Sequence, residues 1–266
     1  MGARVIVVTS GKGGVGKTTS TANIAVALAK EGKKVVAVDT DIGLRNLDVV
    51  MGLESRVVYS FIDVIEKNCR LNQALVRDKR VENLYLLPAA QTRTKDAVSP
   101  EQMMNLCEQL RPDFDFVLLD CPAGIEGGFR NAAAGADEAL VVTTPEIPAV
   151  RDADRIIGML ESLGKSPIRL IINRFRASMV QSNDMLPQED ILEILSIKLI
   201  GIVPEDDSVI KSTNRGEPLT FAPASPAATA YSNIAARILG KNVPLMRLDA
   251  HGSRNIFSGL KKMLGF

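Results

Sequence analysis

Short apolar runs alternate with longer stretches of helical periodicity along the chain. The apolar runs predict strands at Arg4–Thr9, Lys34–Asp39, Leu84–Pro88, Phe116–Asp120, Ala139–Thr143, Arg169–Asn173 and Leu199–Val203. Helices are predicted near Lys17–Lys30, Pro100–Leu110, Pro148–Leu163, Pro187–Leu195 and Pro226–Leu239. Most of the strand runs are continuously apolar, which is typical of parallel strands covered by helices on both faces. The pattern therefore predicts an α/β fold with a single doubly wound, mostly parallel sheet flanked by helices.

The pattern changes after residue 240. Residues 1–240 are predicted to form the α/β domain, 241–254 a linker and 255–266 an amphipathic helix. On one face of that helix, within an arc of about 120°, lie five apolar side chains, namely Ile256, Phe257, Leu260, Met263 and Leu264. Lys261 and Lys262 lie on the opposite side. This arrangement is typical of a helix that binds an anionic membrane surface; the alternative is a core helix that folds back on the domain.

The composition of the chain limits the kinds of partner that we expect it to bind. The 32 Lys and Arg residues nearly balance the 31 Asp and Glu residues, so the net charge is +1. Such a chain has no bulk field to hold nucleic acid, and we expect no nucleic-acid partner. Its three cysteines have no spacing that suggests zinc or a disulfide framework, and we expect them to be reduced in a cytoplasmic protein.

A glycine-rich motif follows the first predicted strand and precedes the first predicted helix. Its eight residues match G-x-x-x-x-G-K-[ST] in full: Gly11, Lys12, Gly13, Gly14, Val15, Gly16, Lys17 and Thr18. Glycines let the backbone N–H groups turn toward phosphates, and the helix N-terminus adds partial positive charge. Lys17 is expected to reach the β- and γ-phosphates, and Thr18 to ligate Mg²⁺. The motif predicts a P-loop NTPase; the alternative is a glycine-rich turn without a ligand.

Aspartates end two of the predicted strands. Asp39 and Asp41 follow one apolar run, and Asp120 ends the run Val117–Leu119 in a Walker B pattern. The carboxyl ends of parallel strands form the edge where open α/β sheets bind ligands. Asp120 is therefore expected to hold Mg²⁺ through water. The alternative is that these residues cap the segments that follow them.

The string from Lys12 to Thr19 resembles the deviant Walker A loop of the MinD/ParA ATPase family. The resemblance implies that Lys12 reaches across an ATP-dependent homodimer to the partner's nucleotide, where its charge would act as an arginine finger does. It also implies that Asp41 orients the attacking water and that Asp39 supports the water shell of the metal. The alternative for Lys12 is an ordinary surface lysine.

The nucleotide base is predicted to be adenine. GTP-specific P-loop proteins of this class use Asn-Lys-x-Asp, whose Asp reads guanine. Here Asn173 is followed by Arg174-Phe175-Arg176, with no Asp at the fourth place. By the resemblance, Asn173 lies at the adenine pocket together with Pro204, Glu205 and Asp206. The alternative is that Asn173 caps a loop.

Further strings resemble the MinD branch of the family. Asp41–Asp48 is similar to its switch I, Asp120–Glu126 to its switch II, and Thr144–Arg155 to the segment that meets its partners. The resemblance implies that Arg151 and Asp152 contact partner proteins. It implies an ATPase, located peripherally on the inner face of the cell membrane, that positions the division septum. Its partners would be a MinC-like division inhibitor and a MinE-like topological factor. The alternatives are a ParA-like DNA-partition ATPase, a soluble P-loop enzyme in which Lys12 is incidental, and a passive membrane scaffold.

Overall fold

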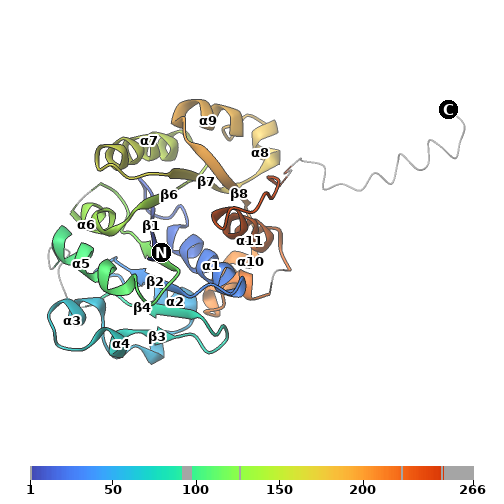
Figure 1. The fold of residues 1–266 in the computed structure, drawn as a ribbon. Coiled ribbons are helices and arrows are strands. Elements are labelled where there is room, and N and C mark those ends of the chain that lie inside the picture. Colours follow the sequence, from blue (N-terminus) through green and yellow to red (C-terminus); the bar gives the residue numbers. More distant parts are fainter. Residues whose placement is uncertain (1, 92–97, 126, 223, 247, 249–266) are drawn as a thin grey trace, which may run out of the picture.

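One twisted sheet runs through the middle of the molecule, with helices on both of its faces (Figure 1). The computed structural model describes residues 2–91, 98–125, 127–222, 224–246 and 248. Within them, the sheet has the strand order β3-β4-β2-β5-β1-β6-β7-β8. The strands are β1 (Arg4–Thr9), β2 (Val35–Asp39), β3 (Val76–Arg77), β4 (Leu84–Leu87), β5 (Phe116–Asp120), β6 (Glu138–Thr143), β7 (Ile168–Phe175) and β8 (Lys198–Pro204). Only the short edge strand β3 pairs antiparallel, so the predicted mostly parallel sheet is confirmed.

The helices form two layers. They are α1 (Lys17–Lys30), α2 (Leu47–Met51), α3 (Phe61–Ile65), α4 (Leu71–Ala74), α5 (Pro100–Leu110), α6 (Gly127–Gly135), α7 (Ile147–Ser162), α8 (Ala177–Gln181), α9 (Gln188–Leu195), α10 (Ser208–Asn214) and α11 (Pro226–Ile238). Two short 3-10 turns are η1 (Glu54–Arg56) and η2 (Leu219–Phe221). One core packs α1, α2 and α11 against one sheet face, and another packs α3, α5, α6, α7 and α9 against the other. Side chains of β1 alternate between them, with Val5 and Val7 in one core and Ile6 and Val8 in the other.

The strand registers gather the functional segments at one edge. Asp39 at the end of β2 lies directly beside Asp120 at the end of β5, and β5 in turn pairs with β1, from which the glycine-rich loop departs. The strand order also changes direction around β1, which is where doubly wound sheets open a crevice for ligands. The sheet therefore brings the loop and both aspartates to one place.

The chain beyond α11 is described in part. Residues 241–246 and 248 carry no helix or strand, and Arg237 donates hydrogen bonds to the carbonyls of Val243 and Pro244 at 2.8 and 2.6 Å. The predicted amphipathic helix at 255–266 lies outside the described residues. Within the described part of the chain, no helix has both the length and the apolar character needed to cross a bilayer.

Candidate nucleotide site

The glycine-rich loop bends sharply between β1 and α1. Gly16 precedes the first residue of α1 with a φ of 95°, in the left-handed region that a side chain disfavours. Its neighbour in space is Asn173, near the carboxyl end of β7, whose Nδ2 would lie 2.2 Å from a Cβ placed on Gly16. The same Nδ2 donates a hydrogen bond to the carbonyl of Val15 at 2.7 Å. A glycine at position 16 is therefore required twice, by its φ and by the approach of Asn173.

The two lysines of the loop lie in different surroundings. Lys17 starts α1 and is only 9% exposed, with its charge near the carboxylate of Asp120. Lys12 is exposed at the rim, and the Ser10 hydroxyl donates a hydrogen bond to its carbonyl at 2.8 Å. Lys17 therefore points charge into the site, whereas Lys12 presents charge to its surroundings.

Asp39 and Asp120 form a buried acidic pair. Burial and, after it, the neighbouring charge of Asp120 raise the pKa of Asp39 to about 7, against hydrogen bonds from the backbone of Leu47 and Asp41 that lower it. Burial also raises the pKa of Asp120 to about 6, although hydrogen bonds from the Thr18 and Thr21 hydroxyls and the charge of Lys17 oppose it. Because both pKa values are raised, a cation bound beside the pair would stabilise its ionised form.

Asp39 also shapes the segment that follows β2. Its Oδ1 accepts a hydrogen bond from the backbone N–H of Asp41 at 2.9 Å, and its Oδ2 accepts one from Leu47 at 3.0 Å. The Thr40 hydroxyl donates to the carbonyl of Asp120 at 2.7 Å. The segment from Asp41 to Leu47 is thus fixed at both ends to the carboxylate of Asp39.

The oxygen atoms at this edge suit Mg²⁺. The Thr18 hydroxyl hydrogen-bonds the carboxylate of Asp120, and Asp39 lies beside it across the β2–β5 pair. Hydroxyl and carboxylate oxygens are the ligands that Mg²⁺ prefers, and a divalent cation would offset the like charges of the acidic pair. Thr18 and Asp120, with Asp39 acting through water, are the residues that could hold it.

A cleft of about 180 Å³ opens beside the loop, between the ends of β7 and β8. It is lined by Gly16, Thr19, Asn173, Arg174, Pro204, Glu205, Asp206, Val209, Ile210 and Tyr231. The carboxylate of Asp206 accepts hydrogen bonds from Ser208 and Ala227, which join the start of α10 to the start of α11. Asp206 therefore fixes the shape of the cleft wall as well as lining it.

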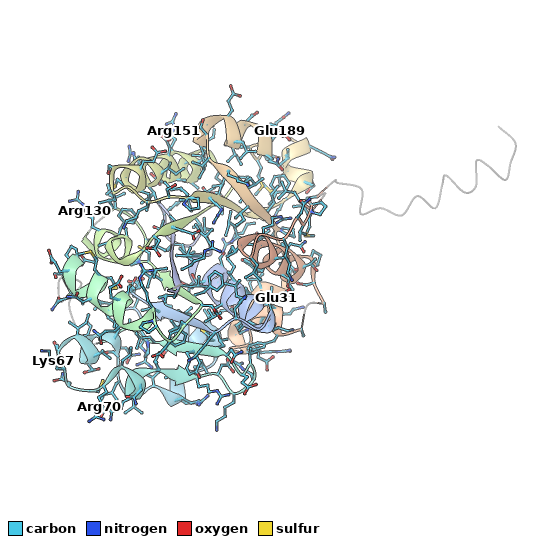
Figure 2. All side chains as sticks on the ribbon, viewed as in Figure 1. Glu31, Lys67, Arg70, Arg130, Arg151 and Glu189 are labelled. Carbon is cyan, nitrogen blue, oxygen red and sulfur yellow. The ribbon has the colours of Figure 1, made fainter. Side chains whose placement is uncertain are left out.

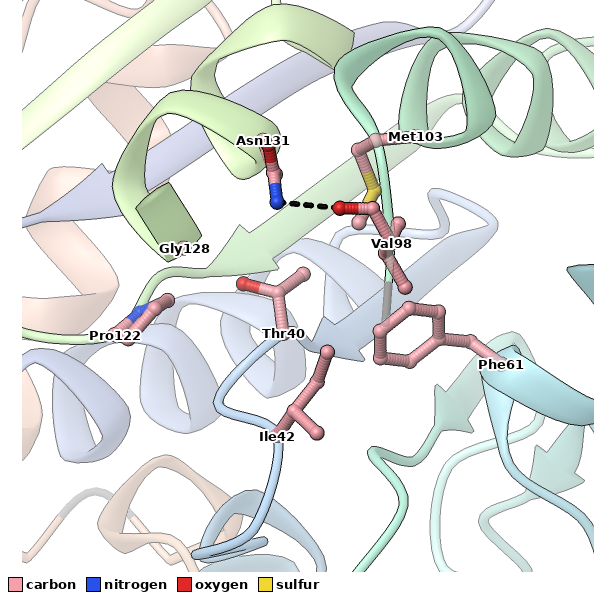
Figure 3. Close-up of a pocket in the computed structure, with 8 residues that line it drawn as sticks. All are labelled: Thr40, Ile42, Phe61, Val98, Met103, Pro122, Gly128 and Asn131. Atoms are coloured by element: carbon pink, nitrogen blue, oxygen red, sulfur yellow. Dashed lines mark hydrogen bonds between the residues drawn. The ribbon is translucent and has the colours of Figure 1, made fainter. Parts of the chain in front are cut away.

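A small apolar cavity of about 10 Å³ lies behind the two segments that follow β2 and β5 (Figure 3). Thr40 and Ile42 reach it from the end of β2, and Pro122 and Gly128 from the segment after β5. The Asn131 amide closes one side by donating to the Val98 carbonyl at 2.6 Å. The backs of both loops therefore share one packing surface.

The structure brings together nearly all of the predicted residues that it describes. The loop from Gly11 to Thr19, the three aspartates and the Asn173 cleft meet at the carboxyl edge of the sheet. Arg151 is exposed on α7 (Figure 2). Asp152, the next residue, is half-buried. The predicted membrane residues, from Ile256 to Leu264, lie outside the described residues.

Sequence reasoning missed some contributors. Thr21 donates to Asp120 at 3.2 Å, and its place four residues after Lys17 on α1 was a readable signal. Ile210, which lines the cleft with 64% of its surface exposed, gave no such signal because it belongs to a seven-residue helix without clear periodicity.

A doubly wound parallel sheet with a glycine-rich loop at its switch point, a buried lysine and paired carboxylates defines a nucleotide-binding P-loop protein. Residues 6–219 match the family described as the CobQ/CobB/MinD/ParA nucleotide binding domain. The chain belongs to this family.

Relatives within the family are similar over almost the whole chain. A septum site-determining protein MinD from Synechocystis is 58% identical over 263 residues, covering 98% of this chain and 99% of that protein. MinD in a MinC:MinD cell division complex from Aquifex aeolicus has a TM-score of 0.87 and 48% identity, over 92% of this chain and 99% of that one. A MinD complexed with Mg-ADP from Pyrococcus horikoshii has a TM-score of 0.80 and 33% identity, over 89% and 96%. The protein is accordingly an ATPase that uses ATP with Mg²⁺ and acts in placing the site of cell division.

Proposed function

We propose that this ATPase is a membrane-attachment switch: ATP joins two copies, the dimer binds the membrane and recruits a division inhibitor, and stimulated hydrolysis releases it. The observation that carries the proposal is the contrast between the two loop lysines. Lys17 is buried in its own site, whereas Lys12 is exposed at the rim and free to meet the nucleotide of a second copy. A charge supplied in this way would stabilise the transferring phosphoryl group.

Exposed apolar side chains support the dimer. Leu44, Ile125 and Ile147 are exposed over 62%, 48% and 56% of their surfaces. They follow β2, β5 and β6 in the chain, so all three lie at the edge that carries Lys12. Large apolar residues placed around a charged site are typical of a surface that another protein covers.

We assign the roles within one copy as follows. The loop from Gly11 to Thr19 binds the phosphates, and the cleft at Asn173, Pro204, Glu205 and Asp206 takes the adenine. Thr18, Asp39 and Asp120 hold Mg²⁺, which when bound neutralises charge on the phosphates. Asp41 orients the attacking water, and its place in a segment anchored by Asp39 suits that role.

The partners are a MinC-like inhibitor and a MinE-like stimulating factor, with Arg151 and Asp152 on α7 as their contact. The solved MinC:MinD complex from Aquifex aeolicus supports the first partner. The membrane anchor is the helix at Ile256–Leu264. One such helix binds weakly, and pairing two on a dimer raises avidity by about 10²–10⁴.

Liposome co-sedimentation with ATP, ADP or no nucleotide tests the switch. We expect ATP-dependent pelleting on anionic vesicles, lost when Ile256–Phe266 is removed. Lys12→Ala is expected to bind ATP but to form no ATP-dependent dimer in light scattering, while Lys33→Ala, at the opposite edge of the sheet, dimerises normally. Equal pelleting with all three nucleotide conditions, or normal dimers of Lys12→Ala, would contradict the proposal.

A further inference from the structure

Two short helices, α2 and α10, meet at their carboxyl ends. Gly52 ends α2, and Gly216 follows the end of α10; their φ values are 64° and 62°. A Cβ on Gly52 would lie 2.4 Å from the carbonyl oxygen of Gly216, and a Cβ on Gly216 would lie 2.4 Å from the Cα of Gly52. Glycine at both positions therefore lets the two backbones touch, and a side chain at either would push the helices apart.

One guanidinium group closes this contact. Arg80, from the turn between β3 and β4, donates from Nη1 to the carbonyl of Gly216 at 2.9 Å and from Nη2 to the carbonyl of Met51. Its Nε and Nη2 also donate to the fully buried carboxylate of Asp78, at 3.0 and 2.7 Å. The guanidinium carbon lies 4.4 Å from the ring centroid of Phe221 in η2.

The positive charge of Arg80 is favourable at the carboxyl end of α2. The last carbonyls of a helix lack partners within the helix and carry partial negative charge, so a cation there is favourable. Met51 is the last residue of α2, so Arg80 serves that helix in this way, while Gly216 follows the end of α10; Asp78 holds the planar group of Arg80 in one orientation. Lysine has a single ammonium group and could not reproduce this arrangement.

Each of the two helices leads to a different part of the nucleotide site. Val209 and Ile210 of α10 line the cleft beside Asn173. At the other end, α2 begins at Leu47, directly after the loop that carries Asp41, and the backbone N–H of Leu47 donates a hydrogen bond to the carboxylate of Asp39. The α2 helix therefore extends from the carboxylate of Asp39 to α10, the helix that forms a wall of the cleft beside Asn173.

We infer that Arg80 is a positioning residue that couples occupancy of the base cleft to the loop carrying Asp41. A base that packs against Ile210 holds α10 in place. The Gly52–Gly216 contact and Arg80 transmit this restraint to α2, and Asp39 and Leu47 pass it to the loop. The inference rests on the proposed placement of the adenine in this cleft. The competing interpretation is that Arg80 only stabilises the β3–β4 turn.

Full-length Arg80→Ala and Arg80→Lys test the coupling, with Lys79→Ala, the exposed neighbour in the same turn, as matched control. ADP affinity is measured by titration with a fluorescent analogue, and pyrophosphate affinity by competition. Pyrophosphate has no base, so it reports the phosphate loop alone. We expect both Arg80 variants to bind ADP about tenfold more weakly and pyrophosphate as the wild type does.

Hydrogen exchange gives a second readout. In the wild type, ADP is expected to slow exchange of the α2 amides as well as those of α10. In Arg80→Lys, the protection of α2 should be lost while α1 stays protected. Gly216→Ala, which parts the helices while keeping the Arg80 side chain, should have the same effect and serves if Arg80→Ala does not fold.

The outcomes separate the two ideas. Equal weakening of ADP and pyrophosphate, or a lower denaturation midpoint with unchanged ADP affinity and α2 protection, would show that Arg80 is only structural and overturn the inference. If wild-type ADP binding left α10 unprotected, or if Ile210→Ala and Asn173→Ala bound ADP normally, the base-cleft assignment itself would fail.

Discussion

Acidic residues at the amino ends of the strands (the amino edge) and at their carboxyl ends (the carboxyl edge) differ in their charged partners. At the amino edge, Glu138 at the start of β6 accepts hydrogen bonds from Arg4 at 2.6 and 2.8 Å and from Arg169 at 2.8 Å. Asp137 beside it accepts two from Arg111, at 2.7 and 2.9 Å. Burial raises the pKa of both carboxyl groups, but their arginine partners outweigh it and hold each pKa below its usual value.

At the carboxyl edge, Asp39 and Asp120 have no arginine partner among the residues that the structure describes. Burial and mutual repulsion raise the pKa of Asp39 to about 7, and burial raises that of Asp120 to about 6. Lys17 is the cation near Asp120, and it is also the residue expected to bind phosphate. The chain therefore neutralises its own charges at one edge and leaves the other to be completed by a ligand. This difference by itself indicates that the functional site lies at the carboxyl edge.

The largest expected effect comes from removing the charge of the carboxyl edge. Lys17→Ala should weaken nucleotide binding by about 100-fold or more, because a desolvated lysine on phosphate contributes a strong charge-assisted hydrogen bond. Titration with fluorescent ADP measures the loss, and circular dichroism checks the fold. Lys33→Ala provides the matched control. A loss of less than tenfold would show that the loop backbone, not Lys17, dominates binding.

A substitution at the amino edge should lower the stability of the fold and leave nucleotide binding unchanged. Glu138→Ala leaves two arginines without their carboxylate and should lower the free energy of unfolding by about 2–3 kcal/mol, with unchanged ADP affinity. Urea denaturation measures the first and ADP titration the second. Glu189→Ala, exposed on α9 (Figure 2), is the control and should change stability by about 0.5 kcal/mol or less. Weakened ADP binding in Glu138→Ala would mean that the two edges are not independent.

Much of this contrast was readable from sequence, but only at one edge. The glycine-rich motif and the strand-end aspartates are local patterns, so their positions at the carboxyl edge of the sheet could be predicted, and the long apolar runs predicted seven of the described strands. The pairing of Glu138 with Arg4 and Arg169 depends on which strands become neighbours, and the pattern alone does not fix strand order. The contacts of Arg80 could not be predicted for the same reason. They join residues from four segments, and the helices involved are too short to show a hydrophobic period.

The smallest expected effect is the pH dependence of stability, and it bears on both edges at once. For Asp39 and Asp120 the folded pKa lies above the unfolded value of about 4, so the folded state binds protons that the unfolded state does not. Stability should therefore rise as the pH falls from 8 toward 5, by about 1–2 kcal/mol. For Asp137 and Glu138 the folded pKa is lowered, so their contribution is present above pH 4 and is lost as the pH falls further.

Urea denaturation from pH 8 to pH 3 should accordingly give a maximum near pH 5. Saturating Mg-ADP is expected to remove the rise between pH 8 and pH 5, because the added cation keeps the carboxylates ionised and satisfied. The descent below pH 4 should persist, since the arginine pairs lie at the opposite edge, and Glu138→Gln should make it shallower. A stability that stayed flat from pH 8 to pH 5 without ligand would show that the carboxyl edge is already neutralised by the chain. The electrostatic contrast between the two edges would then be wrong, whatever the nucleotide affinity.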